Sequence, residues 1–146
     1  FHGDYVLADE DGLWYMRGRT DDVINVSGHR MSTAEIEHIV ISYKKISDAA
    51  SISIPDELTG EAIVVFFVAN NHNIINFESE IADYISTKIG KIAKPKHIFQ
   101  LSDLPKTRTG KIMRRLLKSK LLGMELGDLS SLENPNVLDE IDKFKV

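Results

Sequence analysis

The longest strongly apolar stretch of this chain is the eight-residue run at residues 62–69. A second run rich in strand-forming residues, 49–54, precedes it, and a polar, turn-prone segment at 55–60 separates the two. Two such runs joined by turn residues predict an antiparallel pair of strands. A membrane-spanning helix needs about twenty apolar residues, so we expect no such helix and no membrane partner.

Three other segments carry apolar residues at every third or fourth position, which predicts helices with one buried face. The first follows a capping-box pattern, Ser32 with Glu35 three positions later, and its apolar positions are Ile36, Ile39, Val40 and Tyr43. The second follows a candidate cap, Asn76, and buries Phe77, Ile81, Ile85 and Ile89. The stripe of the third comprises Ile112, Met113, Leu116, Leu117 and Leu121.

Shorter elements complete the expected organisation. Residues 5–7 and 13–16 flank an Asp-Gly turn and predict a β-hairpin. Residues 23–26 and 97–101 are expected as short strands, with a polar turn at 27–30, while the acidic tail from residue 123 is weakly patterned. The whole pattern predicts a small α+β domain, in which short sheets are flanked by about three helices and preceded by the β-hairpin.

The charge of the chain is strongly polarised. Its 146 residues, about one domain's worth, carry a net charge of −4, but residues 88–120 hold eleven of the eighteen basic residues and a single acid, Asp103. That segment therefore carries +10 and the remainder −14. Such a block favours an anionic partner. Because its only aromatic residue is Phe99 and it lacks a nucleic-acid-binding motif, we expect a small polyanion and no nucleic acid.

Two absences limit the chemistry. The chain has no cysteine, which excludes disulfides, zinc ribbons and thiol nucleophiles and agrees with a reducing compartment; we expect a cytoplasmic protein. The sequence begins with Phe1 and carries no recognisable targeting segment. We therefore expect it to be a piece of a longer protein.

The basic loop at residues 105–111 (PKTRTGK) is the most suggestive candidate for a functional site. It is not a P-loop, because Pro105 and Ile112 stand where that motif requires Gly and Ser or Thr. What remains is Lys111 on a flexible loop at the start of a helix, where free backbone N–H groups favour anions. On spacing alone, Lys111 is either a group that stabilises a phosphate or carboxylate, or a solvated surface lysine.

Two adjacent carboxylates, Asp21 and Asp22, follow Arg19 and could bind a sugar diol or simply end a strand. No histidine or third carboxylate lies nearby at ligand spacing, so we predict no metal site in the chain.

Five motifs, in this order, resemble the adenylate-forming ligases and most of all the acetyl-CoA synthetases within them. They are residues 3–4 (GD), 18–22 (GRTDD), 27–30 (SGHR), 34–37 (AEIE) and 104–115 (LPKTRTGKIMRR). The tail at 126–137 resembles the terminus of the acetate enzyme as well, so the match covers essentially the whole chain.

The resemblance implies a two-step reaction. Acetate attacks ATP to give acetyl-AMP and pyrophosphate, and the thiol of CoA then displaces AMP; Mg²⁺ would be bound mainly through ATP and the absent domain. Residues 1–20 would end a large N-terminal domain, residues 21–146 would form a mobile C-terminal domain, and Asp21 would be the hinge. The piece alone is expected to be inactive.

The same resemblance assigns roles to individual residues. Asp4 and Arg19 would hold the ribose of the nucleotide, and Arg30 its phosphate. Lys111 would reach the substrate carboxylate and α-phosphate during adenylation only, and would be a site of acetylation by a lysine acetyltransferase and removal by a deacetylase.

The binding of CoA is less completely matched. Ser27 and Gly28 would line the pantetheine tunnel, where a Cβ at residue 28 would obstruct. Ser86 stands where the acetate enzymes carry an arginine for a CoA phosphate, so either Lys88 or Lys91 substitutes or CoA is held differently. Two alternatives stay open: a ligase for propionate or butyrate, and a stand-alone CoA-binding or regulatory module.

Overall fold

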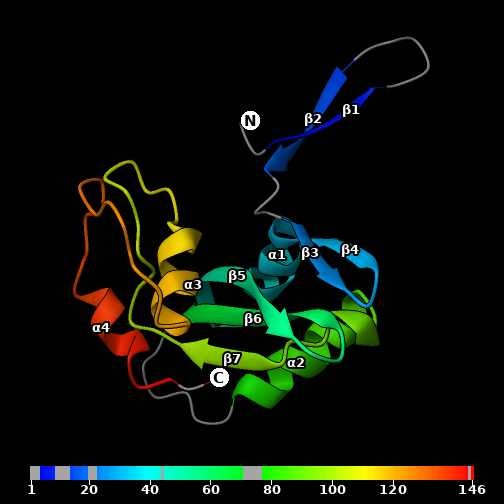
Figure 1. Cartoon of the computed structure of the whole chain (residues 1–146). Coiled ribbons are helices and arrows are strands. Elements are labelled where there is room, and N and C mark those ends of the chain that lie inside the picture. Colours follow the sequence, from blue (N-terminus) through cyan, green and yellow to red (C-terminus); the bar gives the residue numbers. More distant parts are fainter. Residues whose placement is uncertain (1–3, 9–13, 20–22, 44, 71–76, 145) are drawn as a thin grey trace.

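The computed structural model describes residues 4–8, 14–19, 23–43, 45–70, 77–144 and 146 (Figure 1). The first described element is the predicted hairpin, in which β1 (Asp4–Ala8) pairs antiparallel with β2 (Trp14–Arg19) as a two-stranded sheet of its own. Asp4 and Arg19 are cross-strand partners in this register. The Asp-Gly turn at 9–12, the hinge candidate Asp21 and the cap candidate Asn76 lie outside the described residues.

A five-stranded mixed sheet organises the rest of the chain. The long pair β5 (Ile46–Asp56) and β6 (Gly60–Ala69) is antiparallel, as predicted, and β7 (His97–Gln100) pairs parallel with β6. The hairpin of β3 (Val23–Val26) and β4 (His29–Ser32) joins β6 at one position, Val26 opposite Gly60. Figure 1 shows β5, β6 and β7 side by side in the centre of the domain.

The two faces of β6 are buried in separate cores. Ile63, Val65 and Phe67 pack with α1 (Thr33–Ser42) and α2 (Phe77–Lys88). Val64 and Phe66, which alternate with them, pack with α3 (Arg114–Leu121) and α4 (Val137–Ile141). All five of these side chains are at most 1% exposed. The uninterrupted apolar run follows from this, because a strand covered on both faces has no polar side.

The free edge of β5 is closed by an edge clamp, which we define as Glu37, Ser51 and Arg114. Glu37, on α1, is a buried carboxylate that accepts the Ser51 N–H at 3.0 Å. It also accepts two hydrogen bonds from the Arg114 guanidinium on α3, one of them 2.7 Å from Nε to Oε1. Because α1 and α3 cover opposite faces of the sheet, the edge clamp ties the two layers together around the strand edge.

The three predicted helices are present, with two corrections of detail. Ser32 is the N-cap of α1 but its side chain makes no capping hydrogen bond, so the predicted capping box is wrong; the backbone of Ser32 is held instead by the pairing of β4 with β3. The helix α3 begins at Arg114 rather than at Ile112, because Ile112 forms a β-bridge with Lys106 that keeps its backbone out of the helix.

Two segments hold more structure than their sequences indicated. The polar turn expected at 27–30 is confined to Ser27 and Gly28, and His29 and Arg30 already belong to β4. The weakly patterned tail folds back on the sheet through α4, and its buried apolar residues are Val137, Leu138 and Ile141. A short 3-10 helix, η2 (Lys91–Ala93), precedes β7. In the described part of the chain, no helix is long and apolar enough to cross a membrane.

The edge clamp predicts a specific loss of stability. Glu37→Ala removes the acceptor shared by a backbone N–H and a guanidinium, and it should lower the free energy of unfolding by about 2–3 kcal/mol. Glu35→Ala, at an exposed position of the same helix, is the matched control and should stay within about 0.5 kcal/mol. Urea denaturation measures both, and equal effects would remove the edge clamp as a source of stability.

Candidate functional site

The loop that carries Lys111 is a tight turn closed by its own backbone. Lys106 and Ile112 form an antiparallel β-bridge at its base. Inside it, the Thr107 N–H donates to the Lys111 carbonyl at 2.9 Å, and the Lys111 N–H donates to Thr107 Oγ1 at 3.1 Å. Gly110 adopts a left-handed φ of 88° that lets the chain reverse.

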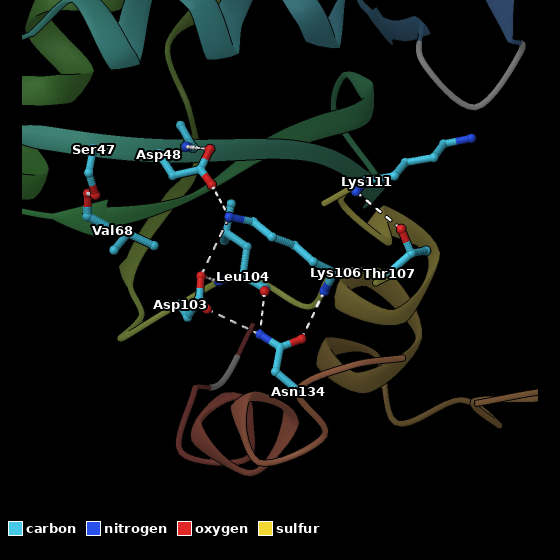
Figure 2. A network of polar contacts seen from close by, with 10 residues as sticks. Ser47, Asp48, Val68, Asp103, Leu104, Lys106, Thr107, Lys111 and Asn134 are labelled. Carbon is cyan, nitrogen blue, oxygen red and sulfur yellow. Dashed lines mark hydrogen bonds and ion pairs between the residues drawn. The ribbon is translucent and has the colours of Figure 1, made fainter. Parts of the chain in front are cut away.

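Lys111 itself projects from this turn into solvent. Its side chain is exposed, and Figure 2 shows it extended away from the polar network beneath the loop. The N-cap of α3 is Met113, two residues further on, so Lys111 lies just before the helix and outside its first turn. The turn therefore presents the Lys111 ammonium to solvent, and it also carries the exposed Arg108, whose Nε lies 3.3 Å from Glu133 Oε2.

A second candidate surface is the two-residue turn between β3 and β4. Ser27 and Gly28 have left-handed φ values of 50° and 83°, the pattern of the tight turns that close β-hairpins. The Ser27 N–H donates to the Thr59 carbonyl at 2.8 Å, which seats this turn against the turn between β5 and β6. A Cβ on Gly28 would meet no described atom within 4 Å, so the glycine is needed here for its φ and not for space inside the domain.

The turn that receives Ser27 is itself held by a carboxylate. Asp56 accepts hydrogen bonds from the backbone N–H of Leu58 and from both the N–H and the hydroxyl of Thr59. Lys96 Nζ lies 2.7 Å from its other oxygen. The hydrogen bond from Lys96, followed by those from Thr59, lowers the pKa of Asp56 well below its ordinary value. Asp56 is therefore ionised at neutral pH and keeps the turn in place.

Next to these turns lies a groove of about 350 Å³ with a basic and apolar lining. Its lysines are Lys91, Lys94 and Lys96, and its apolar part includes Leu58, which is 94% exposed, and Ile92. This arrangement suits an anion attached to an apolar group.

The remaining residues expected at a CoA site lie on α2. Lys88 is its last residue, and its ammonium lies 5.5 Å from the centre of the Tyr84 ring. The Oγ of Ser86 is buried and has no hydrogen-bond partner among the described residues. Sequence reasoning did not anticipate Lys94 and Lys96 beside this surface, since a groove between a turn and a 3-10 helix leaves no periodic signal.

The predicted site residues fall into separate groups. Ser27, Gly28 and Arg30 share the β3–β4 hairpin, where Arg30 pairs in register with Asn25 and is exposed. Asp4 and Arg19 are partners in the backbone register of the other hairpin. In Figure 1 the turn before α3, which carries Lys111, and the tip of the β3–β4 hairpin lie at different ends of the domain. Among the described residues, no group of three His, Cys, Asp or Glu side chains could hold a metal ion.

Comparison with known proteins identifies the family. Residues 35–111, slightly more than half of the chain, match the family described as the AMP-binding enzyme C-terminal domain. The chain belongs to this family. The matched segment begins at Glu35 on α1 and ends at Lys111, so it contains the edge-clamp residues Glu37 and Ser51 and the whole basic loop.

Curated relatives extend the match over nearly the whole chain. Acetyl-coenzyme A synthetase of Penicillium chrysogenum is 46% identical over 144 residues, which cover 97% of this chain and 22% of that protein. Its counterpart from Methanothrix thermoacetophila is 41% identical over 141 residues, covering 95% of this chain and 21% of that protein. The chain thus spans about a fifth of the length of these relatives.

Solved structures share the fold. A Mycobacterium tuberculosis fatty acyl CoA synthetase matches 82% of this chain with a TM-score of 0.64 and 29% identity, over 23% of its own chain. MatB from Rhodopseudomonas palustris, solved with ATP bound, matches 80% of this chain and 23% of its own, with a TM-score of 0.68 and 24% identity. These likenesses confirm the expected fold class, a small α+β C-terminal domain of an adenylate-forming ligase.

The backbone of the β3–β4 turn predicts different responses at its two positions. Gly28→Ala places a Cβ at a left-handed φ and should cost about 1–2 kcal/mol of stability without any clash inside the domain. Ser27→Gly should change stability by less than about 0.5 kcal/mol, because relief of left-handed strain offsets the greater backbone entropy of glycine. Thermal unfolding of the two variants checks this, and a Gly28→Ala variant as stable as the parent would contradict it.

Proposed function

We propose that this chain is the C-terminal part of an acetate–CoA ligase that forms acetyl-AMP and then acetyl-CoA. The observation that supports this most is identity of 41–46% to acetyl-coenzyme A synthetases over nearly the whole chain. In the first step an acetate oxygen attacks the α-phosphorus of ATP and pyrophosphate leaves. In the second step the CoA thiol attacks the acetyl carbonyl and AMP leaves.

Lys111 acts in the first step. Its exposed ammonium, at the tip of a backbone-closed turn, can reach a site on another domain and hold the negative charge shared by the carboxylate and the α-phosphate. Mg²⁺ enters as part of the ATP substrate and is held mainly by ATP and the large N-terminal domain. The surrounding basic segment, with its net charge of +10, attracts both anionic substrates.

Three residues from the N-terminal part of the chain contact the nucleotide. Asp4 and Arg19, partners across the β1–β2 hairpin, bind the ribose hydroxyls, and Arg30 binds the phosphate from β4. Residues 1–20 end the large domain and Asp21 is the hinge about which residues 21–146 turn. This turning brings the Lys111 loop and the β3–β4 turn to the substrates one after the other, which accounts for their separation in the fold.

The second step uses the β3–β4 turn. Ser27 and Gly28 border the path of the pantetheine arm. A Cβ on Gly28 would meet no described atom of this domain within 4 Å, so a side chain there would project outward into that path. The CoA phosphates meet the lysines nearby, Lys88 on α2 or Lys91 on η2, in place of the arginine that Ser86 replaces.

Regulation by lysine acetylation fits the same site. The Lys111 side chain is exposed and stands at the tip of a turn, where a modifying enzyme can reach it. Acetylation removes the charge that adenylation needs. A lysine acetyltransferase and a deacetylase are the proposed partners, and a cytoplasmic location stays a prediction.

Adenylation without Lys111 tests the first step. In the full-length protein, Lys111→Ala should slow acetate-dependent ATP–pyrophosphate exchange by roughly 10²–10³-fold, the cost of removing one charge-stabilising donor. Thioester formation from supplied acetyl-adenylate should be unchanged. Lys143→Ala, an exposed lysine near the C-terminus, is the control and should leave exchange intact. Unchanged exchange in the Lys111 variant would remove it from the site, and exchange with a longer acid in place of acetate would correct the substrate.

A bulky residue at position 28 tests the second step. Gly28→Leu should block thioester formation from acetyl-adenylate and spare pyrophosphate exchange, because its side chain fills the path of the thiol. Gly28→Ala carries the same backbone strain with little bulk, so it separates obstruction from strain. If Gly28→Leu lowered both half-reactions equally, or if Gly28→Ala blocked thioester formation as completely, the residue would be structural.

A further inference from the structure

The tail between α3 and α4 is fixed against the domain at several points. The Arg115 guanidinium donates to the carbonyls of Leu126 and Asp128, the latter at 3.1 Å. Leu126 and Leu132 are partly buried against the core formed with α3 and α4. The segment 126–134, which we name the strap, therefore has a defined position in the fold.

The strap meets the base of the Lys111 loop through three consecutive residues. Leu132 forms a β-bridge with Thr107, and the Glu133 N–H donates to the Lys106 carbonyl at 2.9 Å. Asn134 Oδ1 accepts the Lys106 N–H at 2.9 Å. Both backbone polar groups of Lys106 are thus bound by the strap.

Asn134 also binds the two residues that precede Pro105 (Figure 2). Its Nδ2 donates to the Leu104 carbonyl at 2.7 Å and to Asp103 Oδ2 at 3.3 Å. Leu104 is fully buried. A single amide side chain therefore fixes Lys106 relative to a residue anchored in the core, across the rigid Pro105.

The Lys106 side chain continues the same network toward the sheet. Its ammonium lies 2.6 Å from Asp48 Oδ2 on β5 and 3.6 Å from Asp103 Oδ1. The hydrogen bond to Asp48 raises the pKa of Lys106. The Lys106 ammonium is therefore held by carboxylates of the domain itself, although Lys106 belongs to the same basic loop as Lys111.

The position of Lys111 depends on this base. In the described residues, its backbone hydrogen bonds run only to Thr107, and the bridge between Lys106 and Ile112 closes the turn around it. The strap binds the backbones of Lys106 and Thr107, and its Glu133 also pairs with Arg108, at 3.3 Å from Oε2 to Nε. A shift of the base would therefore move the turn that carries the ammonium.

We infer that Asn134 is a positioning residue for Lys111: its amide joins the strap, the buried Leu104 and the Lys106 backbone, and so aims the Lys111 ammonium during adenylation. The inference rests on the proposed function of Lys111. Asn134 has no contact with the reacting atoms and acts only through the loop.

The test uses the two half-reactions of the full-length protein. Asn134→Ala should slow acetate-dependent pyrophosphate exchange by about 10-fold or more, since a misplacement near 1 Å costs up to about 10²-fold. Thioester formation from supplied acetyl-adenylate should be unchanged, which also shows that the variant folds. Asn136→Ala is the matched control, because Asn136 is exposed, lies two residues away and makes no capping hydrogen bond with its side chain.

Two further variants separate positioning from general stability. Asn134→Asp retains an acceptor for the Lys106 N–H but sets a carboxylate oxygen against the Leu104 carbonyl and the Asp103 carboxylate, so exchange should fall at least as far as in Asn134→Ala. Combined with Lys111→Ala, the Asn134→Ala change should cause no additional loss of exchange, because the group it positions is gone.

Equal loss of both half-reactions in Asn134→Ala, an additive loss in the double variant, or full exchange activity would each overturn the inference. The Lys111→Ala variant alone reports on the proposed function. A large loss there together with an unaffected Asn134→Ala would reject the positioning role and leave the proposed function intact.

Discussion

Burial of β6 on both faces is the constraint from which the rest of this domain follows. Its alternating side chains enter two cores that do not share residues, so the chain must supply a helical layer for each. The first layer comes from α1 and α2, and the second from α3, α4 and the tail around them. The helices of the second layer come last in the chain, and the Lys111 loop directly precedes α3. The loop therefore belongs to this second layer.

Two ion pairs connect elements that lie on different parts of the sheet. Glu37 links α1 to α3 around the edge of β5, and Lys106 links the Lys111 loop to Asp48 on the same strand. Both use an ion pair whose acid lies more than fifty residues from its base in sequence. The two candidate surfaces, the Lys111 loop and the β3–β4 turn, are consequently attached to one stiff framework, and neither is supported by the other.

The sequence predicted the elements whose signals are local. The β5–β6 pair, the hairpin β1–β2 and the three longer helices follow from short-range periodicity and turn residues, and all of them are present. Strand β4 was missed because His29 and Arg30 have no alternating apolar pattern. The capping box failed because strand pairing determines the conformation at Ser32. The functional motifs were found through resemblance, whereas Asn134 escaped notice because its partners lie about thirty residues away and no local pattern marks such a contact.

The late position of the second layer also affects how the chain matures during synthesis. Val64 and Phe66 emerge from the ribosome long before Leu116, Leu138 and Ile141, which cover them in the finished domain. Until residue 141 is available, the face of β6 that carries Val64 and Phe66 lacks part of its apolar cover. Such a surface is a binding site for chaperones and a starting point for aggregation. The strap that supports the Lys111 loop is made just before the last helix that covers this apolar face. The nascent domain therefore completes the loop at nearly the same time as it buries that face.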